Sequence, residues 1–336
     1  MTRTALVTGS AGFIGYFTAK ALLDQGWRVI GLDALSDYYD VQLKEKRLAM
    51  LQEYAGFTAI TERLETPNVL RDLFQKHQFD AVIHLAAQAG VRHSIDAPRT
   101  YVEANLVGTF ELLEAARAFP PTHMLLASTS SIYGANTAMP YKETDKVDLQ
   151  MSFYAATKKA TEAMAHSYAH LYSLPITMFR FFTVYGPWGR PDMAHFKFTK
   201  AILNGDPIEI YNHGNMKRDF TYIDDLVRSI LVLINVVPPM PGAEPIEGDS
   251  LSPVAPYRVV NIGTGSPLQL MDFIKAIETA VGIEAQKIYK DMQPGDVPAT
   301  WADATLLNTL TGQVESTPVS IGITAFVDWY REYYEV

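Results

Sequence analysis

Short apolar runs alternate with amphipathic stretches along the first half of the chain. The runs TALVTG (4–9), RVIGLD (28–33), DAVIHLAA (80–87) and HMLLAST (123–129) are continuous and do not alternate apolar with polar residues. Strands buried on both faces of a parallel sheet have this pattern. Residues 13–26 have helical periodicity and end at a glycine, and 175–182 predict another strand. Together they predict an α/β fold with a Rossmann-like, doubly wound parallel sheet.

The pattern becomes less regular after residue 185. Residues 186–193 are rich in turn formers, 196–205 and 268–282 predict helices, and 258–265 predict a strand. The stretch 238–257 is dense in proline and glycine and predicts an exposed loop. We therefore expect one domain over 1–185 and a smaller C-terminal α+β region over 186–336, with segments near 220–262 rejoining the first domain.

The amino-acid composition limits the kinds of protein and partner that the chain can represent. The 336 residues are 48% hydrophobic and 19% charged, with a net charge of −9, which predicts a soluble globular protein and argues against a nucleic-acid partner. The longest apolar stretch, 230–237, is far shorter than the ~20 residues of a membrane helix. The chain has no cysteine, which fits a reducing cytoplasm, and its histidines have no metal-ligand spacing. We assign no metal and expect a cytoplasmic protein.

A glycine-rich turn joins the first predicted strand to the first predicted helix. TGSAGFIG places Gly9, Gly12 and Gly15 where a backbone must approach a pyrophosphate at a helix N-terminus. The second strand ends in Asp33, the place expected for an acid that binds ribose hydroxyls. Because a carboxylate there repels an additional phosphate, the sequence favours NAD over NADP as cofactor.

A tyrosine and a lysine share one face of the helix predicted at 152–172. Tyr154 and Lys158 are four residues apart, so their side chains are neighbours. The charges of Lys158 and of a nicotinamide ring would lower the pKa of the phenol, making Tyr154 a usable base near neutral pH. One segment upstream, STSSIYG (128–134) presents the hydroxyl groups of four serine and threonine residues, and no carboxylate, after a buried strand.

These motifs resemble a known superfamily. TGSAGFIG, Asp33, HLAAQAG, STSSIYG and YAATK together are similar to the extended short-chain dehydrogenases/reductases, and the resemblance runs across nearly the whole chain. Within that superfamily, residues 36–48, 88–98, 185–194, 216–225 and 292–303 resemble UDP-glucuronate 4-epimerases. These segments lie outside the shared cofactor core, so they are the more specific signal. The resemblance makes 186–336 mainly a UDP-sugar-binding region.

The resemblance implies transient oxidation at carbon 4 of a UDP-sugar. Tyr154 would take the 4-hydroxyl proton, Lys158 would support it, and Thr129 would bind the 4-oxygen. Related dehydratases carry an Asp-Glu pair in this segment and related decarboxylases carry Glu at position 131, whereas this chain has Ser130 and Ser131. Oxidising a uronic acid at carbon 4 makes a β-keto acid that can lose carbon dioxide. We therefore expect the hydroxyls of four residues to hold this carboxylate: Thr129, Ser130, Ser131 and Thr183.

Further contacts follow from the same resemblance. The expected cofactor-binding residues are Gly9, Gly12, Phe13, Ile14, Gly15, Asp33, Leu64, Ala86, Ala87, Tyr154 and Lys158. Arg190 and Arg218 match positions that meet the UDP diphosphate, Asp296 matches a nucleotide ribose contact, and Arg92 is expected near the sugar. Two positions depart from the family pattern. Arg63 stands where an acid commonly contacts adenine, which predicts weaker retention of NAD, and His195 replaces an apolar residue.

The sequence leaves alternatives open. The leading hypothesis is interconversion of UDP-glucuronate and UDP-galacturonate. A 4-epimerase of neutral UDP-sugars is the second hypothesis, a UDP-glucuronate decarboxylase the third, and a non-catalytic NAD-binding regulator on the same fold the fourth. The family usually forms homodimers through two helices per subunit, which correspond to those around 101–118 and 154–172 here.

Overall fold

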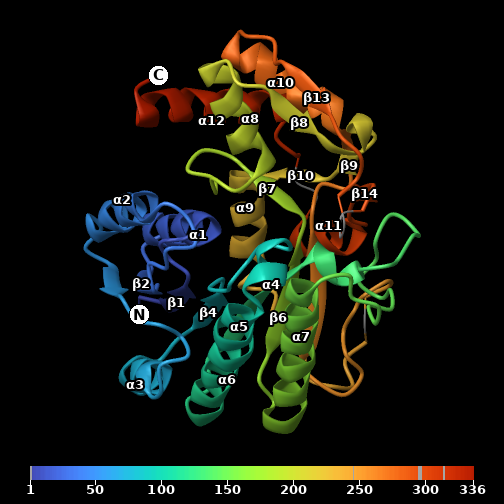
Figure 1. The fold of residues 1–336 in the computed structure, drawn as a ribbon. Coiled ribbons are helices and arrows are strands. Elements are labelled where there is room, and N and C mark those ends of the chain that lie inside the picture. The colour runs from blue at the N-terminus through green and yellow to red at the C-terminus, as the bar shows by residue number, and fades with distance from the viewer. Residues whose placement is uncertain (1, 245, 294–296, 313–314) are drawn as a thin grey trace.

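A seven-stranded parallel sheet forms the centre of the computed structural model, which describes residues 2–244, 246–293, 297–312 and 315–336 (Figure 1). The strand order is β11-β6-β5-β4-β1-β2-β3, and every pair is parallel. The order reverses direction at β1, and helices cover both faces. This is the doubly wound, Rossmann-like α/β sheet predicted from the alternating pattern.

The strands of this sheet are short, and most of them are shorter than the predicted runs, whereas β5 spans its predicted run completely. They are β1 (Thr4–Thr8), β2 (Arg28–Leu32), β3 (Phe57–Ile60), β4 (Ala81–His84), β5 (His123–Thr129), β6 (Ile176–Phe181) and β11 (Tyr257–Ile262). Successive residues alternate between the two faces, as in β1, where Ala5 and Val7 join one core and Leu6 joins the other. Both faces are apolar, which explains the continuous hydrophobic runs.

Helices from distant parts of the chain share each face. One core is formed by α1 (Phe13–Asp24), α2 (Val41–Gln52), α9 (Ile223–Leu233) and α11 (Thr305–Thr311). The opposite core is formed by α3 (Val69–Lys76), α6 (Gly108–Ala118) and α7 (Phe153–Tyr172). Both α9 and β11 pack on the first domain although they lie between 220 and 262. The division into domains at 185, with segments near 220–262 rejoining the first domain, stays a prediction.

The C-terminal region has its own apolar core beyond the carboxyl ends of the strands (Figure 1). Its helices are α8 (Ala194–Asn204), α10 (Leu270–Val281) and α12 (Val319–Tyr334). Helix α10 begins two residues later than predicted, because Leu268–Gln269 form strand β12. The rings of Phe220 and Phe273 stack with centroids 3.8 Å apart and an interplanar angle of 3°, which ties a small strand to α10.

Small sheets and short helices complete the region and the loops. Three small sheets pair β7 (Thr183–Tyr185) with β10 (Phe220–Tyr222), β8 (Ile208–Ile210) with β13 (Lys287–Tyr289), and β9 (Lys217–Arg218) with β12 and β14 (Ala299–Thr300). The short helices are α4 (His93–Asp96), α5 (Pro98–Tyr101), the π-helix η1 (Val102–Val107) and the 3₁₀ helices η2 (Ser130–Tyr133) and η3 (Tyr211–Gly214). Among the described residues, no helix has both the length and the apolar character needed to cross a membrane.

Candidate active site

The glycine-rich turn after β1 is built so tightly that side chains are excluded. A Cβ on Gly15 would lie 1.9 Å from the carbonyl oxygen of Gly9, and one on Gly9 would lie 2.8 Å from the backbone nitrogen of Ala86. Gly9 also has φ +73°, which favours glycine. Gly12 is the N-cap of α1, so the helix N-terminus opens without a covering side chain. This geometry suits the pyrophosphate of a dinucleotide.

Asp33 follows β2 and is held by the backbone on both sides. One carboxylate oxygen accepts a hydrogen bond from the Ala11 N–H at 2.9 Å, and the other accepts one from the Leu35 N–H at 2.8 Å. Because Ala11 lies within the glycine turn, Asp33 and that turn form one rigid unit. Each carboxylate oxygen keeps a further lone pair, to which a ribose hydroxyl could donate.

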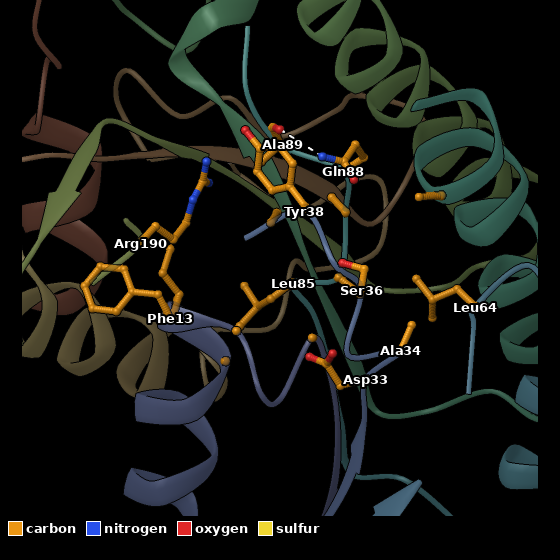
Figure 2. A pocket seen from close by; sticks show the side chains of 18 of the residues that line it. Phe13, Asp33, Ala34, Ser36, Tyr38, Leu64, Leu85, Gln88, Ala89 and Arg190 are labelled. Carbon is orange, nitrogen blue, oxygen red and sulfur yellow. Dashed lines mark hydrogen bonds between the residues drawn. The ribbon is translucent and has the colours of Figure 1, made fainter. Parts of the chain in front are cut away.

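A cavity of about 690 Å³ lies at the carboxyl ends of the central strands (Figure 2). Figure 2 shows Phe13 and Arg190 on one side and Leu64 on the other, with Asp33 between them. Of the predicted site residues, the following line it: Gly9, Gly12, Phe13, Ile14, Gly15, Asp33, Leu64, Ala86, Ala87, Thr129, Tyr154, Lys158 and Arg190. The structure therefore brings the predicted cofactor residues and the predicted catalytic residues into one cavity.

Tyr154, Lys158 and Thr129 meet at the wall of this cavity. The first two lie one turn apart on α7, and Thr129 is the last residue of β5. Burial raises the pKa of Tyr154, and the Thr129 hydroxyl opposes that rise. Burial lowers the pKa of Lys158 to about 8, with the Glu162 carboxylate acting in the opposite direction. Burial thus moves the two pKa values apart, and the pKa of Tyr154 moves in the direction opposite to the lowering expected from the charges of Lys158 and a nicotinamide ring. The two groups remain neighbours at the cavity wall, where a phenol can exchange a proton with a bound hydroxyl group.

Asn105 is a support of this site that sequence reasoning missed. It is buried in the π-helix η1, and its amide nitrogen donates to the Thr157 hydroxyl on α7 and to the Gln88 carbonyl, both at 3.1 Å. Its amide oxygen accepts from the Gln88 N–H at 2.8 Å. Asn105 thus joins the loop after β4 to the helix of Tyr154. A π-helix often marks a functional site, but nothing in the local sequence separates it from an ordinary helix.

Lys44 on α2 is a second cavity residue without a sequence assignment. Its ammonium group donates to the carbonyl oxygen of Ser36 at 2.5 Å and to its hydroxyl at 3.0 Å. Burial lowers its pKa, and nearby Asp33 opposes this change. Lys44 therefore places a cation beside the predicted ribose acid.

A buried ionic network lies behind the catalytic trio. The Ser128 hydroxyl donates to Glu162 at 2.7 Å, and Arg180 donates to both carboxylate oxygens of Glu162, at 3.0 and 2.9 Å. Arg180 also donates to the Tyr133 hydroxyl at 3.0 Å and to the Glu143 carbonyl at 3.1 Å. The Glu162 and Arg180 side chains are each 3% exposed. The network joins β5, α7 and β6 directly behind the hydroxyl segment.

Glu143, at the edge of the network, makes the free energy of unfolding of the protein depend on pH. Burial raises its pKa to about 7, so its contribution to stability is complete below its unfolded pKa near 4.5 and is lost as the pH rises through 7. We expect Glu143→Gln, which cannot ionise, to gain roughly 3 kcal/mol relative to the native chain between pH 4.5 and 8. Urea unfolding across this range measures the difference. A difference constant with pH would contradict the expectation, and Asp145→Asn is the matched control.

The four hydroxyls expected to hold the substrate carboxylate, those of Thr129, Ser130, Ser131 and Thr183, form a carboxylate cradle that only partly borders the cavity. Thr129 lines it, and its hydroxyl donates to the Ser131 hydroxyl and accepts from the Ser131 N–H, both at 3.2 Å. Ser130 and Ser131 are partly exposed in η2 but do not line the cavity wall. Thr183 begins β7 between two wall residues, Phe182 and Val184. Since β5 and β6 are paired, Thr183 is two residues beyond the partner of Thr129, so the four hydroxyls belong to adjacent strand ends.

Of the three arginines expected to meet the substrate, only Arg190 lines the cavity. The guanidinium group of Arg190 donates to both carboxylate oxygens of Asp192, at 3.0 and 2.6 Å. Burial lowers the pKa of Arg190, but the charge and the hydrogen bonds of the Asp192 carboxylate together have the larger effect and the pKa is raised. Arg92 lies over the ring of Tyr211 at 5.6 Å. Arg218 donates to the carbonyls of Val297 at 2.8 Å and of Pro298 at 3.3 Å. Neither Arg92 nor Arg218 lines the cavity, and Asp296 lies outside the described residues.

The two residues that depart from the family pattern, Arg63 and His195, have different surroundings. Arg63 lines the cavity and pairs with Glu65 at 2.8 Å, while its side chain stays 62% exposed. His195 is buried, burial lowers its pKa to about 3, and we find no function for it. Within the described residues, no group of three or more histidine, aspartate or glutamate side chains is arranged to hold a metal ion.

Comparisons with known proteins agree with this geometry. Residues 5–247 match the NAD dependent epimerase/dehydratase family. The chain is 54% identical over 331 residues to a probable UDP-glucuronate 4-epimerase of Rhizobium meliloti, covering 98% of this chain and 97% of that protein. It is 44% identical to UDP-glucuronate 4-epimerase 4 of Arabidopsis thaliana, covering 98% of this chain and 76% of that protein. A UDP-glucuronic acid 4-epimerase from Bacillus cereus, solved with UDP-glucuronic acid and NAD, superposes with a TM-score of 0.87 at 32% identity, covering 98% and 100% of the two chains.

Proposed function

The chain belongs to the NAD-dependent epimerase/dehydratase family, and we propose that within it the protein interconverts UDP-glucuronate and UDP-galacturonate by transient oxidation at carbon 4. The residues present fit NAD, because the glycine turn excludes side chains and Asp33 faces the same cavity. When bound, NAD supplies the acceptor and donor of the hydride at carbon 4. The other requirements fall on the side chains of the protein.

Tyr154 is the proton-transfer residue in this proposal. Its hydroxyl takes the proton of the 4-hydroxyl group and later returns it to the 4-oxygen. Lys158 holds a positive charge one helical turn away, which stabilises the phenolate, and the Thr129 hydroxyl binds the 4-oxygen. Between the two transfers the 4-keto sugar turns within the cavity, so that its opposite face is presented. The cavity of about 690 Å³ must hold both cofactor and substrate in either orientation.

The observation that carries the proposal is the hydroxyl segment beside Tyr154, which contains no carboxylate. Positions 128–131 are Ser, Thr, Ser and Ser. The acid that touches this segment, Glu162, is neutralised by Arg180 and does not line the cavity. Elimination of water needs an additional acid and base, which this segment does not provide. Reversible oxidation with NAD as hydride acceptor needs only one further proton-transfer group, and Tyr154 lines the cavity with Lys158 beside it.

An NMR time course tests the function. Purified protein is incubated with UDP-glucuronate and no added cofactor, and the anomeric signals of the products are followed. UDP-galacturonate as the sole product supports the proposal and shows that NAD is retained despite Arg63. A reaction that begins only when NAD is added supports the same chemistry with a weaker adenine site.

Other outcomes contradict the proposal. UDP-xylose as the main product would identify a decarboxylase. No reaction with NAD present, followed by conversion of UDP-glucose, would identify a 4-epimerase of neutral sugars. If neither substrate reacts while NAD still binds, the protein is a non-catalytic regulator.

Ser131→Glu tests whether the hydroxyls protect the substrate carboxylate. The new carboxylate would lie next to Thr129 and repel the carboxylate of the substrate, favouring its loss as carbon dioxide. We expect UDP-xylose formation to rise at least about tenfold, which corresponds to ~1.4 kcal/mol of repulsion. Ser131→Gln, which adds bulk without charge, is the control. If Ser131→Glu epimerised its substrate at the native rate and formed no UDP-xylose, the hypothesis that the carboxylate cradle protects the substrate would be wrong.

We also infer that the protein is a cytoplasmic homodimer. The helices α6 and α7 lie side by side (Figure 1) and carry exposed apolar side chains, including Phe110 and Phe153, which are 44% and 41% exposed. Such a patch on a folded chain suits association with a second copy. Phe110→Glu is expected to shift the mass measured by light scattering from dimer to monomer. A wild-type monomer would contradict the inferred dimer, whereas an unchanged dimer of the variant would show that the dimer does not form through this face.

A further inference from the structure

Arg47 on α2 is a fully buried guanidinium group whose partners are all neutral. It donates to the Ala11 carbonyl at 3.0 Å, to the Tyr39 hydroxyl at 2.9 Å, and to the carbonyls of Trp188 and Gly189, the last at 3.4 Å. Among the described residues, no carboxylate pairs with it. Burying a cation without a counter-ion is costly, so a purely structural contact between loops would be better served by a neutral side chain.

The acceptors of Arg47 belong to two turns that border the cavity. Ala11 is part of the glycine turn, and its own N–H donates to Asp33. Trp188 and Gly189 immediately precede Arg190, whose side chain lines the cavity opposite Leu64 (Figure 2). The two turns are more than 170 residues apart in sequence, so Arg47 is a direct bridge between the dinucleotide side and the predicted diphosphate side of the site.

The Trp188–Arg190 turn needs external support to keep its shape. Trp188 has φ +57°, an unfavourable value for a residue with a bulky side chain. Its ring packs against Trp329 and Tyr333, with centroids 5.3 and 5.2 Å away, which anchors the turn to α12. Arg47 holds the backbone carbonyls of the same turn and so ties it to α2 and the glycine turn. The position of the Arg190 backbone is thereby fixed relative to the cofactor site.

We propose that Arg47 is a positioning residue that holds the Trp188–Arg190 turn against the glycine turn, so that Arg190 is aligned for the diphosphate of the substrate. The identity of that ligand rests on the proposed function. Because Asp33, Ala11, Arg47 and the turn form one continuous set of hydrogen bonds, order in the cofactor site is transmitted to Arg190.

A double-mutant cycle on UDP binding tests this proposal without requiring turnover. Isothermal titration calorimetry measures the affinity of the NAD-loaded protein for UDP in Arg47→Met, in Arg190→Met and in the double variant. Each single variant is expected to weaken UDP binding about tenfold or more. If Arg47 acts through Arg190, the double variant binds UDP no more weakly than Arg190→Met alone. Arg71→Met, on the exposed face of α3, is the matched control and is expected to bind UDP normally.

NAD content and thermal stability are measured on each preparation. If Arg47→Met does not fold, Arg47→Lys keeps the charge but loses the planar fork, and the same cycle with Arg190→Met applies. Native UDP affinity in a folded Arg47 variant would overturn the proposal. The proposal would also be overturned if the losses of UDP binding free energy in the two single variants added up in the double variant. Failure of the wild-type protein to bind UDP would instead overturn the proposed function and the ligand named with it.

Discussion

Replacing Tyr154 with phenylalanine is expected to lower kcat for epimerisation by about 10²- to 10⁴-fold, because the substitution removes only the hydroxyl that transfers the proton. The ring, the α7 backbone and the contacts of Lys158 remain, so UDP and NAD should bind with near-native affinity. The NMR time course with UDP-glucuronate measures the rate, and calorimetry with UDP measures binding. A large loss in kcat with unchanged binding identifies an interaction that acts on the transition state.

Tyr172→Phe is the matched control for this experiment. Tyr172 ends the same helix, is 37% exposed and lies outside the cavity wall. Its substitution is expected to leave kcat unchanged. If Tyr154→Phe retained more than about a tenth of native kcat, the proton would have to travel by another route, since general acid–base groups contribute at least ~100-fold.

Glu162→Leu is expected to destabilise the protein by about 3–5 kcal/mol, because it leaves the Arg180 charge buried without a carboxylate. It also removes the acceptor of the Ser128 hydroxyl, adjacent to Thr129. The midpoint of urea unfolding, measured at a fixed NAD concentration, reports the loss of stability. The double variant Glu162→Leu/Arg180→Met is expected to recover part of it, since neither charge is then left unpaired.

An exposed pair provides the control for the buried one. Glu114 and Arg117 lie on α6 at 3.4 Å, with side chains 36% and 49% exposed. Glu114→Gln is expected to cost less than ~1 kcal/mol, as is usual for surface ion pairs. A loss of the same small size from Glu162→Leu would mean that water reaches Arg180 and that the network does not support the site.

Features encoded in contiguous residues were predictable. The glycine turn, Asp33, and the Tyr154–Lys158 pair each depend on a local element, and the structure places them in one cavity as expected. Continuous apolar runs predicted strands buried on both faces, and two cores on opposite sides of the sheet confirm this. Each motif lies at the carboxyl end of a strand or the start of a helix, so local sequence was enough to place it.

Features that depend on long-range contacts were not predictable in this way. Arg180 lies inside the apolar run 175–182, and its bidentate contact with Glu162 depends on how β6 packs against α7. Arg47 belongs to a polar stretch that is typical of an exposed helix, and its burial depends on a turn 141 residues away. The contacts that Arg92 and Arg218 make outside the cavity wall likewise depend on tertiary packing. A pattern of residue types predicts an element but does not determine which of its polar side chains is buried.

The position of β11 in the sheet determines where the chain tolerates truncation or cleavage. This strand, from the C-terminal half, covers the outer edge of β6 over its full length, with Tyr257 opposite Ile176 and Ile262 opposite Phe181. A fragment ending at residue 185 would expose the unpaired N–H and carbonyl groups of an apolar strand, a template for aggregation. Cleavage within the loop at 238–256 would leave both pieces paired through that edge. The two halves therefore differ in the ligands proposed for them, but they form a single folding unit.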